Sequence, residues 1–351
     1  MEKRDRFYLI SHGGMLDPFW QPVKKGMETA AKLLDLKATY LGPEEKYSVQ
    51  ALINNVNEAI AAKPDGIAVT ITNAEILDEP LREAIKNNIP IIAINVPDFR
   101  PIGKRIPYLF YIGMDEYVCG RRLAERVLSE KEFMPTRAVV TIHEEGHIGL
   151  EKRVKGIKDI FRRKNIPVDT FYITTDTELA TKKFCEYMEK HPKSNIIFTL
   201  GPLGTIPALN FLEKEKLFGK IKMATVDRLP NTTDDIKKGK ILCTAEQGPY
   251  LQGFMPILWF DQYYKNRNVS YEDILLGPTI VDKYNIDYVE EMEKLIEERS
   301  YESLDYLQKK KFKNILKNVW NNFSKNKDDV LNALDIFKTI ISFVNLFIKV
   351  S

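Results

Sequence analysis

The sequence has few cysteines and almost no excess of charge of either sign. Its three cysteines, Cys119, Cys185 and Cys243, are odd in number and lie far apart. We therefore expect buried thiols rather than a disulfide framework or a clustered metal site. The 52 basic and 49 acidic residues leave a net charge of only +3, which is too small to indicate a nucleic-acid partner.

The sequence also lacks a recognisable export signal and a membrane-spanning stretch. Charged residues at the N-terminus lead into only four apolar ones, Phe7 to Ile10, and no small-residue cleavage pattern follows. A cytoplasmic location and an exported protein whose leader is replaced by Met1 both stay open. The last apolar stretch is interrupted by Asp335, Lys338 and Asn345, so we do not expect it to cross a membrane.

Short apolar runs alternate with helical patterns along most of the chain. They are Phe7 to Ser11, Ala38 to Leu41, Gly66 to Thr72, Pro90 to Val96, Tyr108 to Met114, Arg137 to Ile142, Asp169 to Thr174, Asn195 to Leu200, Lys222 to Asp227 and Ile241 to Ala245. Such alternation indicates βαβ units and parallel sheets with helices on both faces. Because 351 residues exceed what one core usually supports, we predict an α/β fold with two doubly wound parallel-sheet lobes joined by a three-segment hinge.

The same pattern predicts how the chain divides. We assign residues 5–105 and 246–278 to the first lobe, and residues 106–245 and 279–300 to the second. Residues 301–351 are predicted to form an amphipathic helical tail, because their apolar residues recur at helical and 4-3 spacing. Packing or self-association through residues 307–348 is the commoner behaviour of such a seam, and contact of its lysines with a membrane surface is the alternative.

Candidate ligand residues follow the carboxyl ends of the predicted strands, where doubly wound sheets bind their ligands. They are Asp17, Phe19, Trp20, Thr70, Thr72, Asn95, His147, Arg153, Gly201, Asp227 and Gln247. Aromatic rings can cover the C–H face of a sugar, and polar side chains can bind its hydroxyls. This mixture predicts a site for a sugar or another small polar solute, with Phe19 and Trp20 stacking on it.

Several candidates also have a plainer interpretation. Phe19 and Trp20 could belong to the hydrophobic core. Four polar candidates could be ordinary strand residues or surface charges: Thr70, Thr72, Asp17 and Arg153. Asp115 is predicted to cap a helix rather than to contact ligand, because it lies where a strand gives way to a helical pattern.

The string His143-Glu144-Glu145-Gly146-His147 matches the zinc-protease motif H-E-x-x-H. That motif requires both histidines on one face of a helix. Here a predicted strand runs directly into the string, and Gly146 suits a turn. We therefore favour His147 as a ligand residue over a zinc site, and we expect no bound metal and no cofactor.

Short motifs along the chain point to a known family. The most specific are Leu16-Asp17-Pro18-Phe19-Trp20, Lys63-Pro64-Asp65-Gly66-Ile67, Asn88-Ile89-Pro90-Ile91-Ile92, Ile112-Gly113-Met114-Asp115, Arg153 with Gly156, and Gln247-Gly248-Pro249-Tyr250-Leu251-Gln252-Gly253. From Arg6 to Glu298 the sequence resembles the type I periplasmic sugar-binding proteins of ABC importers, such as ribose- and galactose-binding proteins. It departs from many of these at Gly201-Pro202, where they have Asn-Asp, and at Asn95-Val96, where they often have Asp-Arg.

The resemblance implies a carrier that closes like a hinged clamp around a sugar and docks onto the permease of an ABC transporter. It implies a periplasmic or extracellular location. It places seven of the candidates at family ligand positions: Asp17, Phe19, Trp20, Asn95, Arg153, Asp227 and Gln247. The alternative function is a sensing domain that signals through its C-terminal helices. We expect no enzyme, because no nucleophile and base stand in credible spacing.

Overall fold

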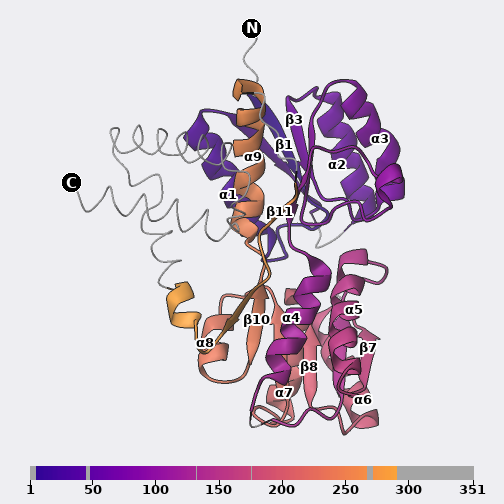
Figure 1. The fold of residues 1–351 in the computed structure, drawn as a ribbon, viewed down its shortest axis with the longest axis vertical. Helices are drawn as coiled ribbons and strands as arrows, with labels where there is room; N and C mark the ends of the chain where they lie inside the picture. The colour runs from indigo at the N-terminus through magenta and orange to yellow at the C-terminus, as the bar shows by residue number, and fades with distance from the viewer. Residues whose placement is uncertain (1–4, 45–47, 132, 175, 267–271, 291–351) are drawn as a thin grey trace, which may run out of the picture.

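The computed structural model describes residues 5–44, 48–131, 133–174, 176–266 and 272–290, which form two α/β lobes (Figure 1). The predicted tail 301–351, including residues 307–348, lies outside the described residues. Among the helices that the structure describes, none is both long enough and apolar enough to cross a membrane.

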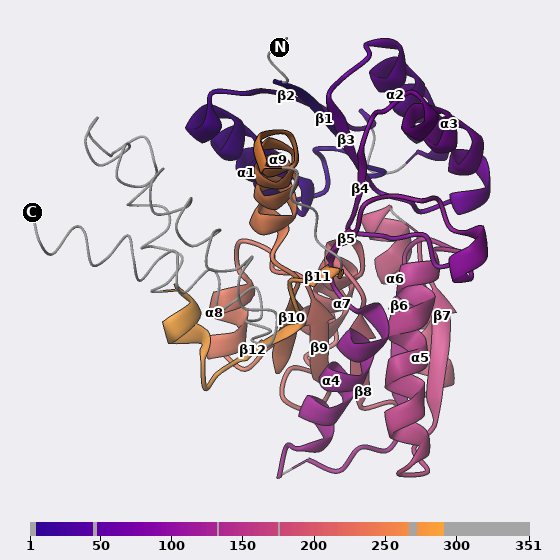
Figure 2. The same ribbon diagram turned by 45° about the horizontal axis from the view of Figure 1, so that its top comes forward.

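The first lobe is built on a six-stranded parallel sheet. Its strands, in spatial order, are β11 (Ile274–Leu275), β5 (Tyr111–Gly113), β4 (Ile91–Ile94), β3 (Gly66–Val69), β1 (Arg6–Ile10) and β2 (Lys37–Leu41). On one face lie α1 (Trp20–Leu34) and α9 (Pro249–Asn266), and on the other lie α2 (Val49–Ala61) and α3 (Ala74–Lys86) (Figures 1 and 2). A short 3-10 turn, η1 (Ile102–Lys104), precedes β5.

The second lobe has a sheet of the same size. Its strands, in spatial order, are β12 (Thr279–Asp282), β10 (Cys243–Glu246), β9 (Lys222–Val226), β8 (Ile196–Thr199), β6 (Ala138–Ile142) and β7 (Val168–Tyr172). One face packs on α4 (Glu116–Leu128) and α5 (Ile148–Arg162), and the other on α6 (Thr177–Lys190), α7 (Pro202–Lys214) and α8 (Thr232–Lys237). The predicted α/β class with two doubly wound sheets is confirmed, with one difference: β12 runs antiparallel to β10.

Burial on both faces explains why the central strands read as unbroken apolar runs. All four residues of β3 and of β4 are buried, and so are all five of β6. Alternate residues of each strand enter opposite cores, as Val139 and Val140 do. A solvated face would have left alternating polar residues instead, so the sequence pattern reports the covering helices.

The chain crosses between the lobes three times. The crossings are the short segments between β5 and α4, between β10 and α9, and between β11 and β12. The sequence-based division placed residues 106–113 in the second lobe, and this is wrong: β5 pairs with β4 and β11 in the first sheet. Because β5 belongs to the first sheet, the crossing falls after β5 rather than before it. Strand periodicity indicates that a strand exists but does not identify the strand that it pairs with.

Close helix pairs in both lobes depend on glycine. A Cβ on Gly253 of α9 would overlap the carbonyl oxygen of Val23 in α1, and a Cβ on Gly120 of α4 would overlap the carbonyl oxygen of Arg153 in α5. In each case the obstructing atom belongs to the backbone, which cannot move aside as a side chain can. The pairs α1–α9 and α4–α5 therefore need glycine at their contact points.

We expect Gly253→Ala to destabilise the protein by about 2 kcal/mol, because the added methyl forces α1 and α9 apart. Urea unfolding followed by circular dichroism measures this loss. The matched control is Gly103→Ala, where a Cβ would meet nothing within 4 Å. Equal stability of the two variants would contradict the packing argument.

Candidate functional site

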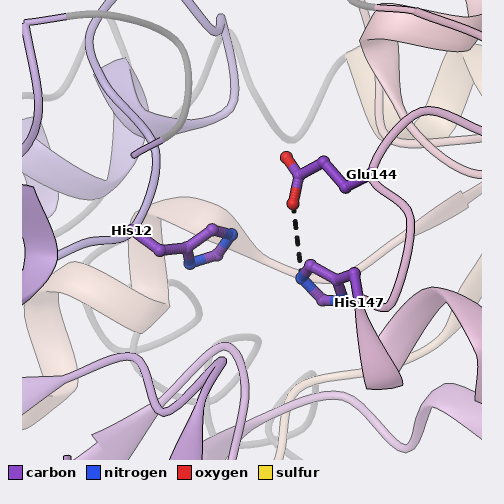
Figure 3. A group of neighbouring side chains, drawn as sticks. All are labelled: His12, Glu144 and His147. Atoms are coloured by element: carbon purple, nitrogen blue, oxygen red, sulfur yellow. Dashed lines mark ion pairs between the residues drawn. The ribbon is translucent and has the colours of Figure 1, made fainter. Parts of the chain in front are cut away.

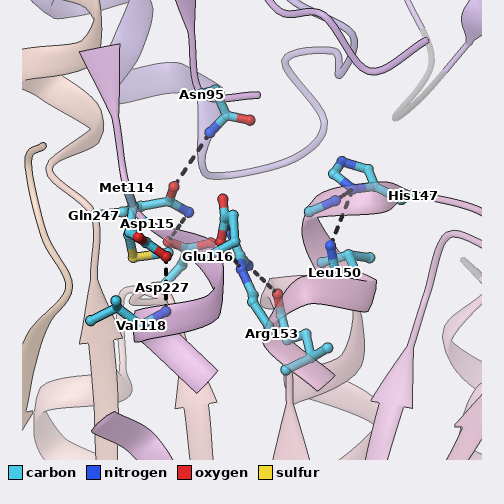
Figure 4. Close-up of polar contacts among 12 residues, drawn as sticks. Asn95, Met114, Asp115, Glu116, Val118, His147, Leu150, Arg153, Asp227 and Gln247 are labelled. Carbon is cyan, nitrogen blue, oxygen red and sulfur yellow. Dashed lines mark hydrogen bonds and ion pairs between the residues drawn. The ribbon is translucent and has the colours of Figure 1, made fainter. Parts of the chain in front are cut away.

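Residues that follow the strands of both sheets meet where the two lobes face each other. His12 comes shortly after β1 of the first lobe, and His147 lies between β6 and α5 of the second. Their ring centroids are 5.5 Å apart. We call this region the inter-lobe site and define it by the side chains described below (Figures 3 and 4).

A chain of amide and carboxylate groups links the lobes through Gln247. Asn95 Nδ2, after β4, donates to Gln247 Oε1 at 3.4 Å and to Gln252 Oε1 at 3.2 Å. Gln247 Nε2 in turn donates to Asp227 Oδ1, after β9, at 2.7 Å (Figure 4). Gln247 stands on the crossing between β10 and α9, so it contacts one candidate residue from each lobe.

Asn95 and Asp227 share an uncommon backbone conformation. Their φ angles are 59° and 67°, in the left-handed region that asparagine and aspartate tolerate better than most residues. Both are buried, and each directly follows the last residue of its strand. Strained backbone at buried polar residues is typical of ligand sites, because the strain fixes where the side chain points.

Arg153 is buried and tied to two other parts of the second lobe. Its Nε and Nη2 donate to the carboxylate of Glu116, at the start of α4 (Figure 4). Its Nη1 donates to the carbonyl oxygen of Leu200 at 2.7 Å. Burial opposes the charge on Arg153, but the Glu116 carboxylate outweighs it and raises the Arg153 pKa above its ordinary value. Arg153 therefore carries its charge inside the protein with Glu116 as its ion-pair partner, and it is not the surface charge of the plainer interpretation.

Asp227 is destabilised in its charged form. Burial raises its pKa to about 8, and Arg153 and the hydrogen bond from Gln247 offset only part of that rise. A buried carboxylic acid held this close to neutrality can gain hydrogen bonds when a solute brings hydroxyl groups to it.

The H-E-x-x-H string does not form a helix. Residues 143–147 make a turn between β6 and α5, and His147 is the N-cap of α5. The helical zinc arrangement is thereby ruled out for this string. Among the described residues, a different set could hold a metal ion: His12, Glu144 and His147 offer ligand atoms that all lie within 4.8 Å of one another.

Burial shifts the pKa values of this set and of the neighbouring His143. It lowers the His147 pKa to about 4 and the His143 pKa to about 3, and it lowers the His12 pKa as well. Burial also raises the Glu144 pKa to about 7, with a further contribution from Asp17 across the site. At neutral pH the three histidines are therefore uncharged, whereas Glu144 still spends about half of its time as a carboxylate.

Phe19 and Trp20 lie in the core of the first lobe. Only 7% of Phe19 and 2% of Trp20 is exposed, and both belong to the cluster that contains Phe7 and Met27. The Trp20 ring meets His12 edge-on at a centroid distance of 5.1 Å. These positions match the core interpretation, and stacking of the two rings on a sugar stays a prediction.

The remaining candidates surround this set. Asp17 Oδ1 accepts a hydrogen bond from the Phe19 amide at 3.0 Å in the turn before α1. The Thr70 and Thr72 hydroxyls are buried and have no hydrogen-bond partner among the described residues. Gly201 directly precedes α7, and a Cβ at this position would press on the His143 ring. The His143 ring therefore fills the space beside Gly201, where many of the similar sugar-binding proteins have asparagine.

Asp115 caps α4 as predicted, because its Oδ1 accepts from the Val118 amide at 2.9 Å. Sequence reasoning missed His12, Glu116, Glu144 and Gln252. His12 lies between β1 and Asp17, so the strand-end rule that selected Asp17 applies to it equally. Glu116 follows the capping aspartate and carried no separate signal.

Comparisons with known proteins agree with the fold. Residues 8–267 match the family model described as periplasmic binding protein domain. The chain is 28% identical over 285 residues to the xylose/arabinose-binding protein XylF of Sulfolobus acidocaldarius, covering 77% of this chain but only 66% of that relative's length.

Solved structures show the same similarity. A periplasmic sugar-binding protein of an ABC sugar transporter from Legionella pneumophila is 31% identical, with a TM-score of 0.72 over 77% of this chain and 98% of that one. A carbohydrate transporter protein from Acidothermus cellulolyticus, solved with myo-inositol, is 24% identical with a TM-score of 0.73 over 82% and 98% of the two chains, and that likeness concerns the fold. The chain thus belongs to the periplasmic binding protein family, whose members are non-enzymatic solute-binding proteins that typically act outside the cytoplasm.

Proposed function

We propose that this chain binds a sugar or a closely related polyol at the inter-lobe site and delivers it to the permease of an ABC importer. The observation that carries the proposal is the chain from Asn95 through Gln247 to Asp227, which joins hydrogen-bonding groups of both lobes. Buried amides and acids at such a position suit a solute rich in hydroxyl groups. The two relatives at 28% and 31% identity are described as binding xylose and arabinose and as sugar-binding.

Capture is a shift between an open and a closed arrangement of the lobes. A solute that touches Asp227 and Arg153 on one lobe and Asn95 on the other stabilises the closed arrangement, because only there are all its contacts made at once. The three crossing segments are the places where the chain can bend between the lobes. No bond is made or broken in this cycle, and the protein works outside the cytoplasm.

The alternative, a sensing domain that signals through its C-terminal helices, depends on residues 301–351. That segment lies outside the described residues, as does the self-association or membrane contact predicted for residues 307–348. The sensing alternative therefore stays a prediction.

The proposal is tested by thermal unfolding of the full chain with D-xylose, L-arabinose, D-ribose, D-glucose and myo-inositol. We expect at least one of them to bind, and at 100 times its Kd to add about 2.7 kcal/mol of stability. That corresponds to a Tm increase of roughly 5 °C or more. Isothermal titration calorimetry then gives the Kd.

Gln247→Ala is expected to weaken this binding at least about tenfold, since it removes a link that both lobes share. Gln21→Ala is the matched control, because Gln21 is an exposed glutamine of α1. Binding of amino acids but of no sugar or polyol would refute the proposed function.

A further inference from the structure

His12, Glu144 and His147 come from both lobes and face one another at the inter-lobe site (Figure 3). His12 is 7% exposed, and the side chains of His147 and Glu144 are 10% and 11% exposed. The proposed function does not yet use His12 or Glu144. Polar groups that are this deeply buried are normally hydrogen-bonded in native proteins.

Hydrogen bonds fix where His147 carries its proton. Its Nδ1 lies 3.1 Å from the Gly149 amide nitrogen and 3.3 Å from that of Leu150, at the N-terminus of α5. Backbone amides can only donate, so Nδ1 must accept and be unprotonated. In the neutral ring the proton is then on Nε2, the nitrogen nearer to Glu144.

The gap between His147 and Glu144 is too wide for a direct hydrogen bond. Nε2 and Glu144 Oε2 are 4.0 Å apart (Figure 3), whereas such bonds span about 2.7–3.2 Å. Glu144 Oε2 makes no hydrogen bond within the described part of the chain. One oxygen atom can lie about 2.8 Å from both groups at once, accepting from Nε2–H and donating to the carboxylate.

An alcohol hydroxyl meets both requirements, and a metal ion does not. A metal would need the lone pair of Nε2, which moves the ring proton to Nδ1 and sets it against the two amide donors that cap α5. An anionic group, such as a phosphate or a carboxylate, accepts from Nε2–H but has no proton to give Glu144. It would also meet the Asp17 carboxylate, while the nearby cation, Arg153, is already paired with Glu116.

We propose that His12, Glu144 and His147 form a subsite that binds one hydroxyl of an uncharged sugar and discriminates against sugar phosphates and sugar acids. The inference deepens the proposed function and rests on it. His147 and Glu144, on the second lobe, form hydrogen bonds with the hydroxyl. The His12 ring, on the first lobe, covers it. Closure of the lobes thereby depends on a hydroxyl at one defined position of the sugar.

The test uses the full chain, the best sugar from the panel above, its monodeoxy analogues and its phosphate ester, each titrated by calorimetry. One deoxy analogue should bind the wild type about 10- to 100-fold more weakly than the parent sugar, and the phosphate ester should bind at least as poorly. Glu144→Gln should weaken the parent sugar by a similar factor and lose the discrimination against that analogue. His147→Asn should behave likewise while keeping the α5 cap, because asparagine is a good N-cap residue.

Glu145→Gln is the matched control, since Glu145 is an exposed neighbour that loses the same charge. If the wild type and Glu145→Gln bind the parent sugar but Glu144→Gln retains full affinity and discrimination, the subsite is refuted while the proposed function stands. A wild type that binds no sugar refutes both. Stoichiometric binding of Zn²⁺ alone that Glu144→Gln abolishes would replace the hydroxyl subsite by a metal site.

Discussion

Replacing Arg153 with methionine is expected to lower the free energy of unfolding of the ligand-free protein by about 3–5 kcal/mol. Methionine fills much of the same volume but leaves the Glu116 carboxylate buried without its counter-ion, and leaves the Leu200 carbonyl without its donor. An unpaired buried charge is far more unfavourable than a lost surface ion pair. Urea unfolding monitored by circular dichroism measures the change.

The double variant Arg153→Met with Glu116→Gln distinguishes the effect of an unpaired Glu116 charge from the effect of altered side-chain packing. Glutamine removes the uncompensated charge, so the double variant should regain more than half of the stability lost in the single one. Arg126→Met is the comparison for a less deeply buried arginine paired with Asp282. A loss below about 1 kcal/mol for Arg153→Met, or no recovery in the double variant, would show that the Glu116 pair does not hold this part of the lobe together.

Asp227→Asn is expected to stabilise the protein and to weaken sugar binding. Burial raises the pKa of Asp227 to about 8 in the folded protein, whereas in the unfolded chain it titrates near its ordinary value of 3.8. Both states are protonated below pH 3.8, so there the acid brings no penalty. Between pH 3.8 and 8 the unfolded state loses its proton first, and wild-type stability falls as the pH rises. Asparagine has no such penalty, so the gain grows through this range and levels off above pH 8.

Even half of this pKa shift would change the free energy of unfolding by about 3 kcal/mol. Urea unfolding midpoints measured at pH 5, 7 and 9 should therefore resolve the trend. Sugar affinity should fall about 10- to 100-fold, because the amide nitrogen only donates, whereas the carboxyl oxygen that it replaces can accept a hydrogen bond from a sugar hydroxyl. Asp234→Asn, at an exposed acid of α8, should change neither property. A constant difference between wild type and Asp227→Asn from pH 5 to 9 would contradict the pKa argument.

The elements of this fold could be predicted from the sequence because both faces of each sheet are covered. All ten predicted strands overlap observed ones. What periodicity does not encode is pairing. Tyr111–Gly113 was recognised as a strand yet assigned to the wrong lobe, because its neighbour β4 and its late partner β11 are set by tertiary contacts.

The site was predicted less completely than the fold. The strand-end rule selected Asn95, Asp227 and Gln247, which the structure brings together. The rule could not predict Glu116. This residue matters because its carboxylate pairs with Arg153 on the neighbouring helix, 37 residues further along the chain. Composition also cannot tell a core aromatic from a stacking one, and Phe19 lies in the core for reasons that only packing reveals.

The late position of α9 in the chain sets the order in which a nascent polypeptide can complete its lobes. Phe260 of α9 stacks on Phe7 of β1 at a centroid distance of 5.1 Å, although 253 residues separate them. The ribosome therefore releases the whole of β6 to β10 before the first sheet can be covered by α9. We expect the second lobe to acquire most of its structure first, while apolar surface around Phe7 awaits its cover and offers a binding site to chaperones.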